Sequence, residues 1–137
     1  MTDEEIRAFL ALPLLGVVGT IRKDGRPHAV PVWYRHVEDS TIRIWTEENR
    51  AWVAHARRDP RVTFAVYDAT RPLSGAVIIS GTASFEEIPD ATKSEDVRKI
   101  TERYAAEDKV DYYINLWDYI KTIVTIKSDK VTGWTGA

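Results

Sequence analysis

The feature that most constrains this chain is a series of short runs rich in β-branched and aromatic residues, each bounded by turn-forming residues. Such runs with alternating side chains are typical of half-buried β-strands. The pair Asp24-Gly25 favours a tight hairpin, because glycine adopts a positive φ without a Cβ clash. Pro31 lies inside one run and indicates an edge strand, where an N–H group is not needed for pairing. The predicted strands cover residues 15–21, 28–37, 41–46, 61–68, 76–85, 119–127 and 131–134.

Helices are predicted between and around these strands. At the start of the chain, Thr2 is the expected N-cap, Glu5 completes a capping box, and Pro13 prevents continuation. Asn49 is the expected N-cap of a second helix, which ends before an Asp-Pro pair. The predicted helices cover residues 2–12, 49–58 and 90–106, with a short turn over 112–117 and a loop over 71–75. Hairpin-linked strands with few helices predict a mainly β, α+β chain: an antiparallel barrel of six or seven strands with peripheral helices.

Length and composition limit the possible functions. The chain has 137 residues, which fits one domain over residues 1–137. Its 19 Lys and Arg nearly balance 21 Asp and Glu, so charge gives no general reason to expect a nucleic-acid or membrane partner. The longest apolar stretch, residues 9–19, is interrupted by Pro13, is too short to span a bilayer and lacks the flanks of a signal peptide. We therefore expect a cytoplasmic protein.

Several kinds of catalytic site are missing from the sequence. There is no cysteine, which excludes disulfides, thiolate metal sites and cysteine nucleophiles. His28, His36 and His55 lie far apart along the chain, so we expect no metal centre. No phosphate-binding glycine loop, dinucleotide fingerprint or nucleophile elbow is present. Chemistry would therefore have to come from a bound organic cofactor, and no side chain is assigned a catalytic role.

Four stretches carry a resemblance that covers nearly the whole chain. They are residues 16–32 (GVVGTIRKDGRPHAVPV), 44–62 (IWTEENRAWVAHARRDPRV), 77–84 with Gly81-Thr82-Ala83, and 124–134 ending in KVTGW. In this order they resemble the pyridoxamine 5′-phosphate oxidase-like split-barrel family, and more closely its flavin- and deazaflavin-dependent oxidoreductases. The resemblance implies an FMN-binding split barrel and a homodimer with cofactor sites at the subunit interface.

The resemblance also implies positions for the cofactor. The ring would lie against the first paired strands, and its phosphate-bearing tail would reach the start of the helix near Asn49. Unpaired N–H groups at that helix start and the Arg50 guanidinium suit a phosphate. The implied cofactor-binding residues are Thr20, Ile21, Pro31, Val32, Trp45, Thr46, Asn49, Arg50, Ala51 and Trp52.

One departure from the family pattern bears on the cofactor. Relatives usually have a lysine where this chain has Trp52, and the FMN oxidases tend to carry a basic pair where this chain has Ala51-Trp52. A lost phosphate contact costs ~1.5–3 kcal/mol, which disfavours a cofactor held by a short terminal phosphate. We therefore expect the deazaflavin F420, and a hydride transfer between reduced F420 and a small conjugated substrate. The alternatives are an FMN-dependent oxidase or reductase, and a non-catalytic module that binds flavin or haem.

Some residues also have simpler interpretations. Trp52 can be a core or interface residue, and His28 can be a surface residue instead of a proton donor. The basic run near residues 57–61 is expected to be a solvated helix end. An aromatic cluster can form either a substrate wall or a packing surface. That cluster consists of Tyr112, Tyr113, Trp117 and Tyr119.

Overall fold

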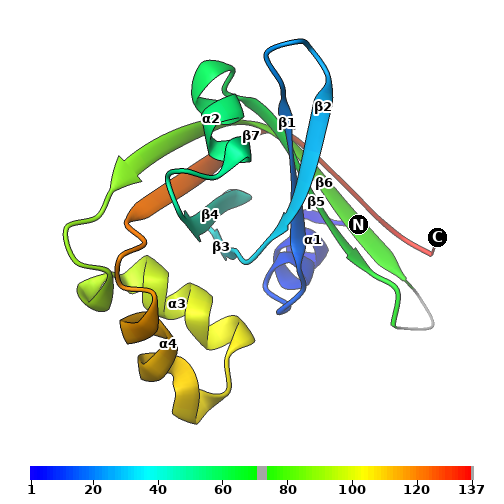
Figure 1. The fold of residues 1–137 in the computed structure, drawn as a ribbon. Helices are drawn as coiled ribbons and strands as arrows, with labels where there is room; N and C mark the ends of the chain where they lie inside the picture. The colour runs from blue at the N-terminus through cyan, green and yellow to red at the C-terminus, as the bar shows by residue number, and fades with distance from the viewer. Residues whose placement is uncertain (71–73, 137) are drawn as a thin grey trace.

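In the computed structural model, which describes residues 1–70 and 74–136, the strands form one antiparallel sheet of seven (Figure 1). Its order is β2-β1-β5-β6-β7-β4-β3, so β2 and β3 are the edges. The sheet curls without closing, which confirms the predicted split barrel. The strands are β1 (Gly16–Ile21), β2 (Pro27–Val32), β3 (Arg35–Val37), β4 (Thr41–Thr46), β5 (Arg61–Asp68), β6 (Gly75–Glu87) and β7 (Thr122–Thr135).

Helices cover the two ends of the curled sheet. Figure 1 shows α2 beside the β1–β2 hairpin, and α3 packed with α4 near the opposite end. No helix in the described part of the chain is long and apolar enough to cross a membrane. The helices are α1 (Asp3–Leu10), α2 (Ala51–Arg58), α3 (Glu95–Tyr104) and α4 (Val110–Leu116), with short 3-10 turns η1 (Ala91–Lys93) and η2 (Glu107–Lys109).

Two local predictions are confirmed in detail. The Glu5 N–H donates to Thr2 Oγ1 at 3.1 Å, and the Thr2 N–H donates to Glu5 Oε1 at 2.8 Å, which completes the capping box of α1. Pro31 lies in β2, an edge strand, as its missing N–H group predicts. Both features depend on residues close together in the sequence.

The strand predicted over residues 28–37 is wrong in its extent, because the chain forms two strands there. Trp33 and Tyr34 carry the backbone from β2 at one edge to β3 at the other. Tyr34 is fully buried and its hydroxyl donates to the Leu10 carbonyl at 3.0 Å. The Tyr34 N–H donates to the Tyr104 hydroxyl at 3.3 Å. These distant partners stabilise the crossing in place of a continuous ladder.

At the C-terminus the opposite error occurs. The predicted strands over 119–127 and 131–134 are one strand, β7, which pairs along the whole of β6. The expected turn at 128–130 is absorbed by a register shift opposite Ser80 and Gly81. A Cβ on Gly81 would lie 2.5 Å from the Lys127 carbonyl oxygen, so only glycine permits this close approach.

The helix predicted over 90–106 is also divided. Asp90 caps η1, and Ser94 caps α3 by accepting from the Val97 N–H at 3.3 Å. Val97 and Ile100 are buried as predicted, whereas Tyr104 is only partly buried, and its hydroxyl donates to the Leu14 carbonyl. Residues 71–73 of the predicted loop lie outside the described residues.

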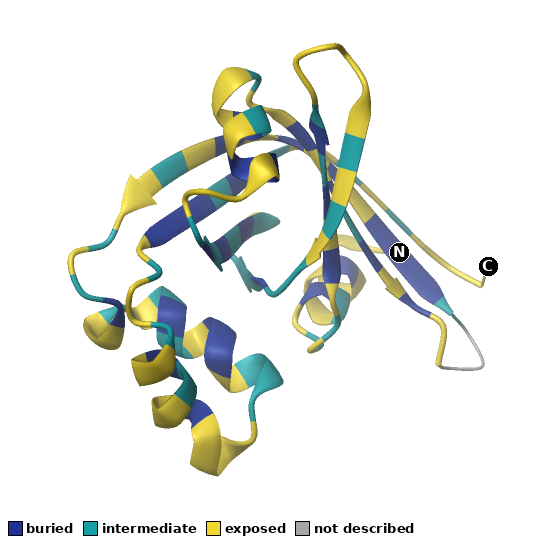
Figure 2. Cartoon of the chain, viewed as in Figure 1, coloured by how far each residue is buried: buried dark blue, intermediate teal, exposed yellow. Residues whose placement is uncertain are grey.

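The core fills the concave side of the sheet (Figure 2). Its largest fully buried side chains include Tyr34, Phe64 and Leu10. A smaller core lies between β7 and the α3–α4 pair and includes Val97, Ile114 and Ile123. The convex side leaves large apolar side chains exposed on β1, β5, β6 and β7. We call these residues the outer apolar face: Leu15, Val17, Tyr67, Ile78 and Trp134.

Candidate functional site

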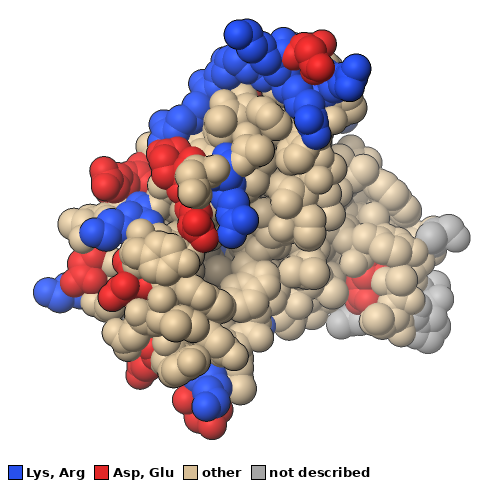
Figure 3. All heavy atoms as spheres, in the orientation of Figure 1, with Lys and Arg blue, Asp and Glu red and all other residues tan. Residues whose placement is uncertain are grey.

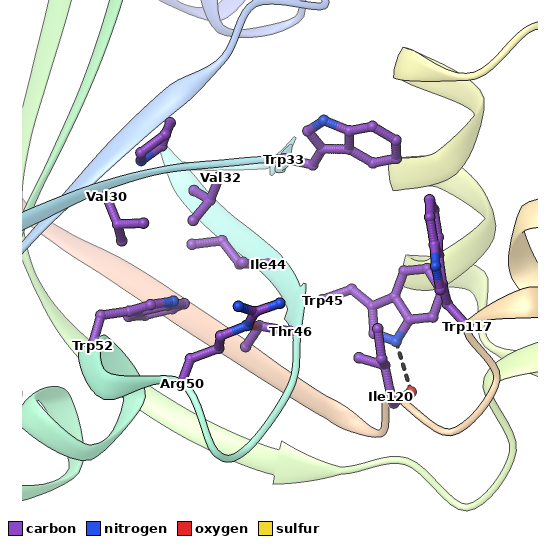
Figure 4. A pocket seen from close by; sticks show the side chains of 11 residues that line it. Val30, Val32, Trp33, Ile44, Trp45, Thr46, Arg50, Trp52, Trp117 and Ile120 are labelled. Carbon is purple, nitrogen blue, oxygen red and sulfur yellow. Dashed lines mark hydrogen bonds between the residues drawn. The ribbon is translucent and has the colours of Figure 1, made fainter.

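A cavity of about 380 Å³ lies where the sheet is split, between β2 and β4 (Figure 4). The start of α2 and the segment between α4 and β7 complete its walls. Four of the five tryptophans of the chain line it, and we call it the tryptophan pocket. Its lining residues are Val30, Pro31, Val32, Trp33, Ile44, Trp45, Thr46, Arg50, Trp52, Trp117 and Ile120.

Contacts with neighbouring residues hold three of these indoles in position. Trp45 Nε1 donates to the Ile120 carbonyl oxygen at 2.7 Å, which joins β4 to the segment before β7 (Figure 4). Trp33 stacks on Tyr104, with ring centroids 4.9 Å apart. Trp117 stacks on Tyr113 at 5.0 Å. Aromatic walls fixed in this way suit a flat conjugated ligand, because little side-chain freedom is lost when it binds.

Trp52 is a core residue that also lines the tryptophan pocket. It is only 3% exposed. It occupies the first turn of α2, where the resemblance would place a lysine. Its indole therefore gives this end of the pocket an apolar surface where relatives have a charge.

Arg50 is the only cationic side chain among the described residues that line the pocket. It occupies the N-cap of α2, so the prediction that Asn49 is the N-cap is wrong by one residue. The first N–H groups of a helix lack intrahelical partners, so α2 presents donors next to this guanidinium. The Arg50 side chain is 61% exposed, and its Nη2 lies 3.2 Å from Glu47 Oε1. An anion at this position would compete with the Glu47 carboxylate.

The structure brings together six of the ten residues predicted to bind the cofactor. Thr20 and Ile21 instead line a separate depression formed by β1, β5 and β6 with the start of β2. Asn49 lines a polar depression beside Arg57, and Ala51 is exposed on α2. The six residues that share the tryptophan pocket are Pro31, Val32, Trp45, Thr46, Arg50 and Trp52.

The sequence did not predict the other residues that line the pocket, for two reasons. Val30, Trp33 and Ile44 are neighbours of predicted residues, and only the split of β2 from β3 shows that they face the cavity. Trp117 and Ile120 come from the distant α4–β7 segment. The aromatic cluster around Trp117 was the available signal. Trp117 lines the pocket and stacks on Tyr113, whereas Tyr112 and Tyr119 are exposed.

The histidines are also differently placed than expected. His28 and His55 are far apart in the sequence, but their rings meet edge to face with centroids 5.1 Å apart. Thr20 Oγ1 lies 3.3 Å from His55 Nδ1, so Thr20 contacts α2 and is not among the residues that line the tryptophan pocket. Within residues 1–70 and 74–136, no group of three His, Asp or Glu side chains is placed to hold a metal ion.

Comparisons with known proteins agree with this architecture. A family model described as pyridoxamine 5′-phosphate oxidase matches residues 2–134. A conserved hypothetical protein from Mycobacterium tuberculosis is 25% identical, with a TM-score of 0.78 over 98% of this chain and 84% of that chain. No curated protein matches the chain.

More distant solved structures share the fold. An F420 reductase is 21% identical, with a TM-score of 0.68 over 92% of this chain and 94% of that chain. An FAD-binding protein from Mesorhizobium loti is 19% identical, with a TM-score of 0.67 over 100% of this chain and 95% of that chain. Together with the match along residues 2–134, the seven-stranded split barrel shows that the chain belongs to the pyridoxamine 5′-phosphate oxidase family.

Proposed function

We propose that this protein is an oxidoreductase that binds F420 in the tryptophan pocket and transfers a hydride between the reduced cofactor and a small conjugated substrate. The observation that carries the proposal is the aromatic cavity at the split of the barrel. The F420 reductase with this fold agrees with it.

The residues present fit a flavin-type ring. Trp45 and Trp117 can contact its faces or edges, and Val30, Val32 and Ile44 add apolar surface. Thr46, which is almost buried, supplies a hydroxyl that can donate to or accept from the polar edge of the ring. When bound, the reduced cofactor would supply the hydride. The side chains would orient the ring and the substrate and exclude water from both.

The charge at the pocket supports F420 over FMN. A short terminal phosphate would find one guanidinium, which is exposed and already paired with Glu47. Trp52 offers an apolar surface where a second cation would be needed. A longer cofactor can distribute its contacts along α2 and β2, and so depends less on a single phosphate site.

The proposal includes a homodimer. The residues of the outer apolar face are exposed apolar side chains grouped on neighbouring strands, not single residues scattered over the surface. Grouped apolar side chains of this kind mark association surfaces. Val17 on that face pairs across the sheet with Pro31, which lines the tryptophan pocket. A second copy covering the outer apolar face would therefore lie next to the pocket and could form part of its wall.

Ligand titration followed by turnover tests the proposal. The purified protein would be titrated with F420 and, separately, with FMN, following the fluorescence of its tryptophans. We expect saturable quenching with F420 and weaker binding of FMN, then oxidation of reduced F420 in the presence of enone-like acceptors. Tight FMN binding without F420 binding would reverse the choice of cofactor. Binding without turnover across a broad panel of acceptors would favour the non-catalytic module.

A further inference from the structure

A second group of polar side chains lies where the C-terminal half of α2 packs against the β1–β2 hairpin. Arg22 Nη2 lies 3.0 Å from His28 Nδ1, and the His28 and His55 rings are in contact. Arg58 donates to the Ile21 carbonyl from the last turn of α2. We call Arg22, His28, His55 and Arg58 the cationic cluster.

Within residues 1–70 and 74–136, the two arginines of this cluster lack the carboxylate partners that the neighbouring arginines have. Among the residues that the structure describes, no carboxylate forms an ion pair with Arg22 or Arg58. The nearby arginines differ, because Arg57 is paired with Glu48 and Arg61 with Asp59. Lys and Arg side chains gather on this end of the molecule over the hairpin and α2 (Figure 3).

Hydrogen bonding fixes the state of His28. A guanidinium can only donate, so His28 Nδ1 must accept from Arg22 and its ring proton lies on Nε2. In the described part of the chain, that Nε2–H has no hydrogen-bond acceptor. Within the described residues, the cluster therefore combines two guanidinium groups that have no carboxylate partner with an imidazole N–H group that has no acceptor.

We propose that the cationic cluster binds an oxyanion, a phosphate or carboxylate group. Arginine forks and imidazole N–H groups are the donors that recognise such groups, through charge-assisted hydrogen bonds. The site is independent of the cofactor assignment, since it is built from side chains outside the tryptophan pocket.

The oxyanion can belong to either of two sources. His28 is two residues from Val30 along β2, about 7 Å, and His55 is one helical turn from Trp52, about 5 Å. The far end of a molecule in the tryptophan pocket could therefore reach the cluster. A separate small anion could bind there as well.

Binding should be visible at the histidines. Burial, together with the nearby His28 ring and the positive charges of Arg22 and Arg58, lowers the pKa of His55, and only Asp24 on the hairpin acts in the opposite direction. Asp24 is also 3.5 Å from Arg26, which reduces its effect on the cluster. An oxyanion bound between these groups would favour the imidazolium form and raise the pKa of His55.

Histidine ring resonances, followed by NMR during a titration with inorganic phosphate and no other ligand, test the proposal. We expect saturable shifts of His28 and His55 and a rise of about one unit in the pKa of His55. His36 on β3 serves as an internal control and should not respond. Arg22→Gln and Arg58→Gln should each weaken phosphate binding about tenfold. Lys23→Gln removes an exposed hairpin charge outside the cluster, one that forms no ion pair in the described structure, and should leave binding unchanged.

Two results would overturn the proposal. One is the absence of saturable shifts at low ionic strength, with the wild-type spectrum showing a folded protein. The other is an equal loss of binding in Lys23→Gln and Arg22→Gln, which would indicate diffuse electrostatic attraction. The phosphate titration is then repeated on protein with FMN bound and on protein with riboflavin bound, which is the phosphate-free control. If the oxyanion belongs to the pocket ligand, FMN should prevent the binding of inorganic phosphate and riboflavin should not. If the cluster binds a separate small anion, inorganic phosphate should bind in both cases.

Discussion

Arg50 Nη2 lies 3.2 Å from Glu47 Oε1. The one cation among the described residues that line the tryptophan pocket therefore already has a carboxylate partner. Both residues precede α2, and the pair is largely exposed to solvent. An exposed pair of this kind contributes little to stability. Its effect on a bound anion is larger, because Glu47 both orients the guanidinium and reduces its net charge.

Opposite changes at this pair should have opposite effects on affinity. Arg50→Gln should weaken F420 binding by about 1.5–3 kcal/mol, since a charge-assisted contact is lost. Glu47→Gln is the matched variant, and it should leave binding unchanged or strengthen it, because the guanidinium is freed. Fluorescence titration measures both dissociation constants. An unchanged constant in Arg50→Gln would remove Arg50 from the site.

Trp45→Phe should loosen the pocket wall. The change keeps an aromatic ring but removes the 2.7 Å hydrogen bond to the Ile120 carbonyl oxygen. We expect a loss of about 1 kcal/mol in the free energy of unfolding and weaker ligand binding. Urea denaturation and ligand titration provide the two measurements. Tyr112→Phe, which removes an exposed aromatic polar group away from both the pocket and the outer apolar face, is the control, and equal ligand affinities in the two variants would contradict the prediction.

Gly81→Ala should destabilise the β6–β7 pairing. The added Cβ would meet the Lys127 carbonyl oxygen at 2.5 Å and Ile126 Cγ2 at 2.9 Å. Relieving such a clash requires a backbone shift that costs about 1–3 kcal/mol. Ser84→Ala, at an exposed position of the same strand, is the control. Equal midpoints for both variants in urea would show that the register shift can accommodate a side chain.

His36 should make stability depend on pH. Burial, with the charges of Arg103 and Arg7, lowers the pKa of His36 from its usual 6.5. Its Nε2 is buried and has no hydrogen-bond partner in the described protein. The unfolded chain therefore binds a proton at a higher pH than the folded protein, so the free energy of unfolding falls as the pH drops below about 6.5.

Replacing the imidazole tests this dependence. His36→Gln should flatten the decline of stability measured by urea denaturation between about pH 7.5 and pH 5.5. A smaller decline should remain, because the pKa of His55 is lowered in the same direction. The double variant His36→Gln/His55→Gln should show a still smaller decline of stability with falling pH. A decline in His36→Gln identical to that of the wild type would contradict the assignment.

Ile78→Glu should separate the proposed dimer. Ile78 is 39% exposed at the centre of the outer apolar face, and a carboxylate there would be buried without a partner on association. We expect a monomer by analytical ultracentrifugation and weaker F420 binding. Ser84→Glu adds the same charge six residues further along β6, about 20 Å from Ile78, and should remain dimeric. A monomeric wild-type protein would refute the dimer and leave the pocket as a single-chain site.

Local sequence predicted the elements whose stabilising partners are close in the chain. The capping box of α1 joins Thr2 to Glu5, and the period-two pattern of β4 alternates between buried and partly buried residues. Pro31 marked an edge strand through its own missing N–H group. The order of motifs extended this to the family and the split barrel, both of which are confirmed.

Long-range contacts decided the rest. Tyr34 divides β2 from β3 because its partners are Leu10 and Tyr104, and β7 runs through a turn-like sequence because β6 pairs along its whole length. The contribution of Trp117 to the pocket wall and the meeting of His28 with His55 depend on where the sheet curls and the helices pack. Periodicity and caps act over a few residues, and therefore determined which segments became strands and helices. The side chains that share a cavity or a charged cluster come from distant segments, and only the packed sheet brings them together.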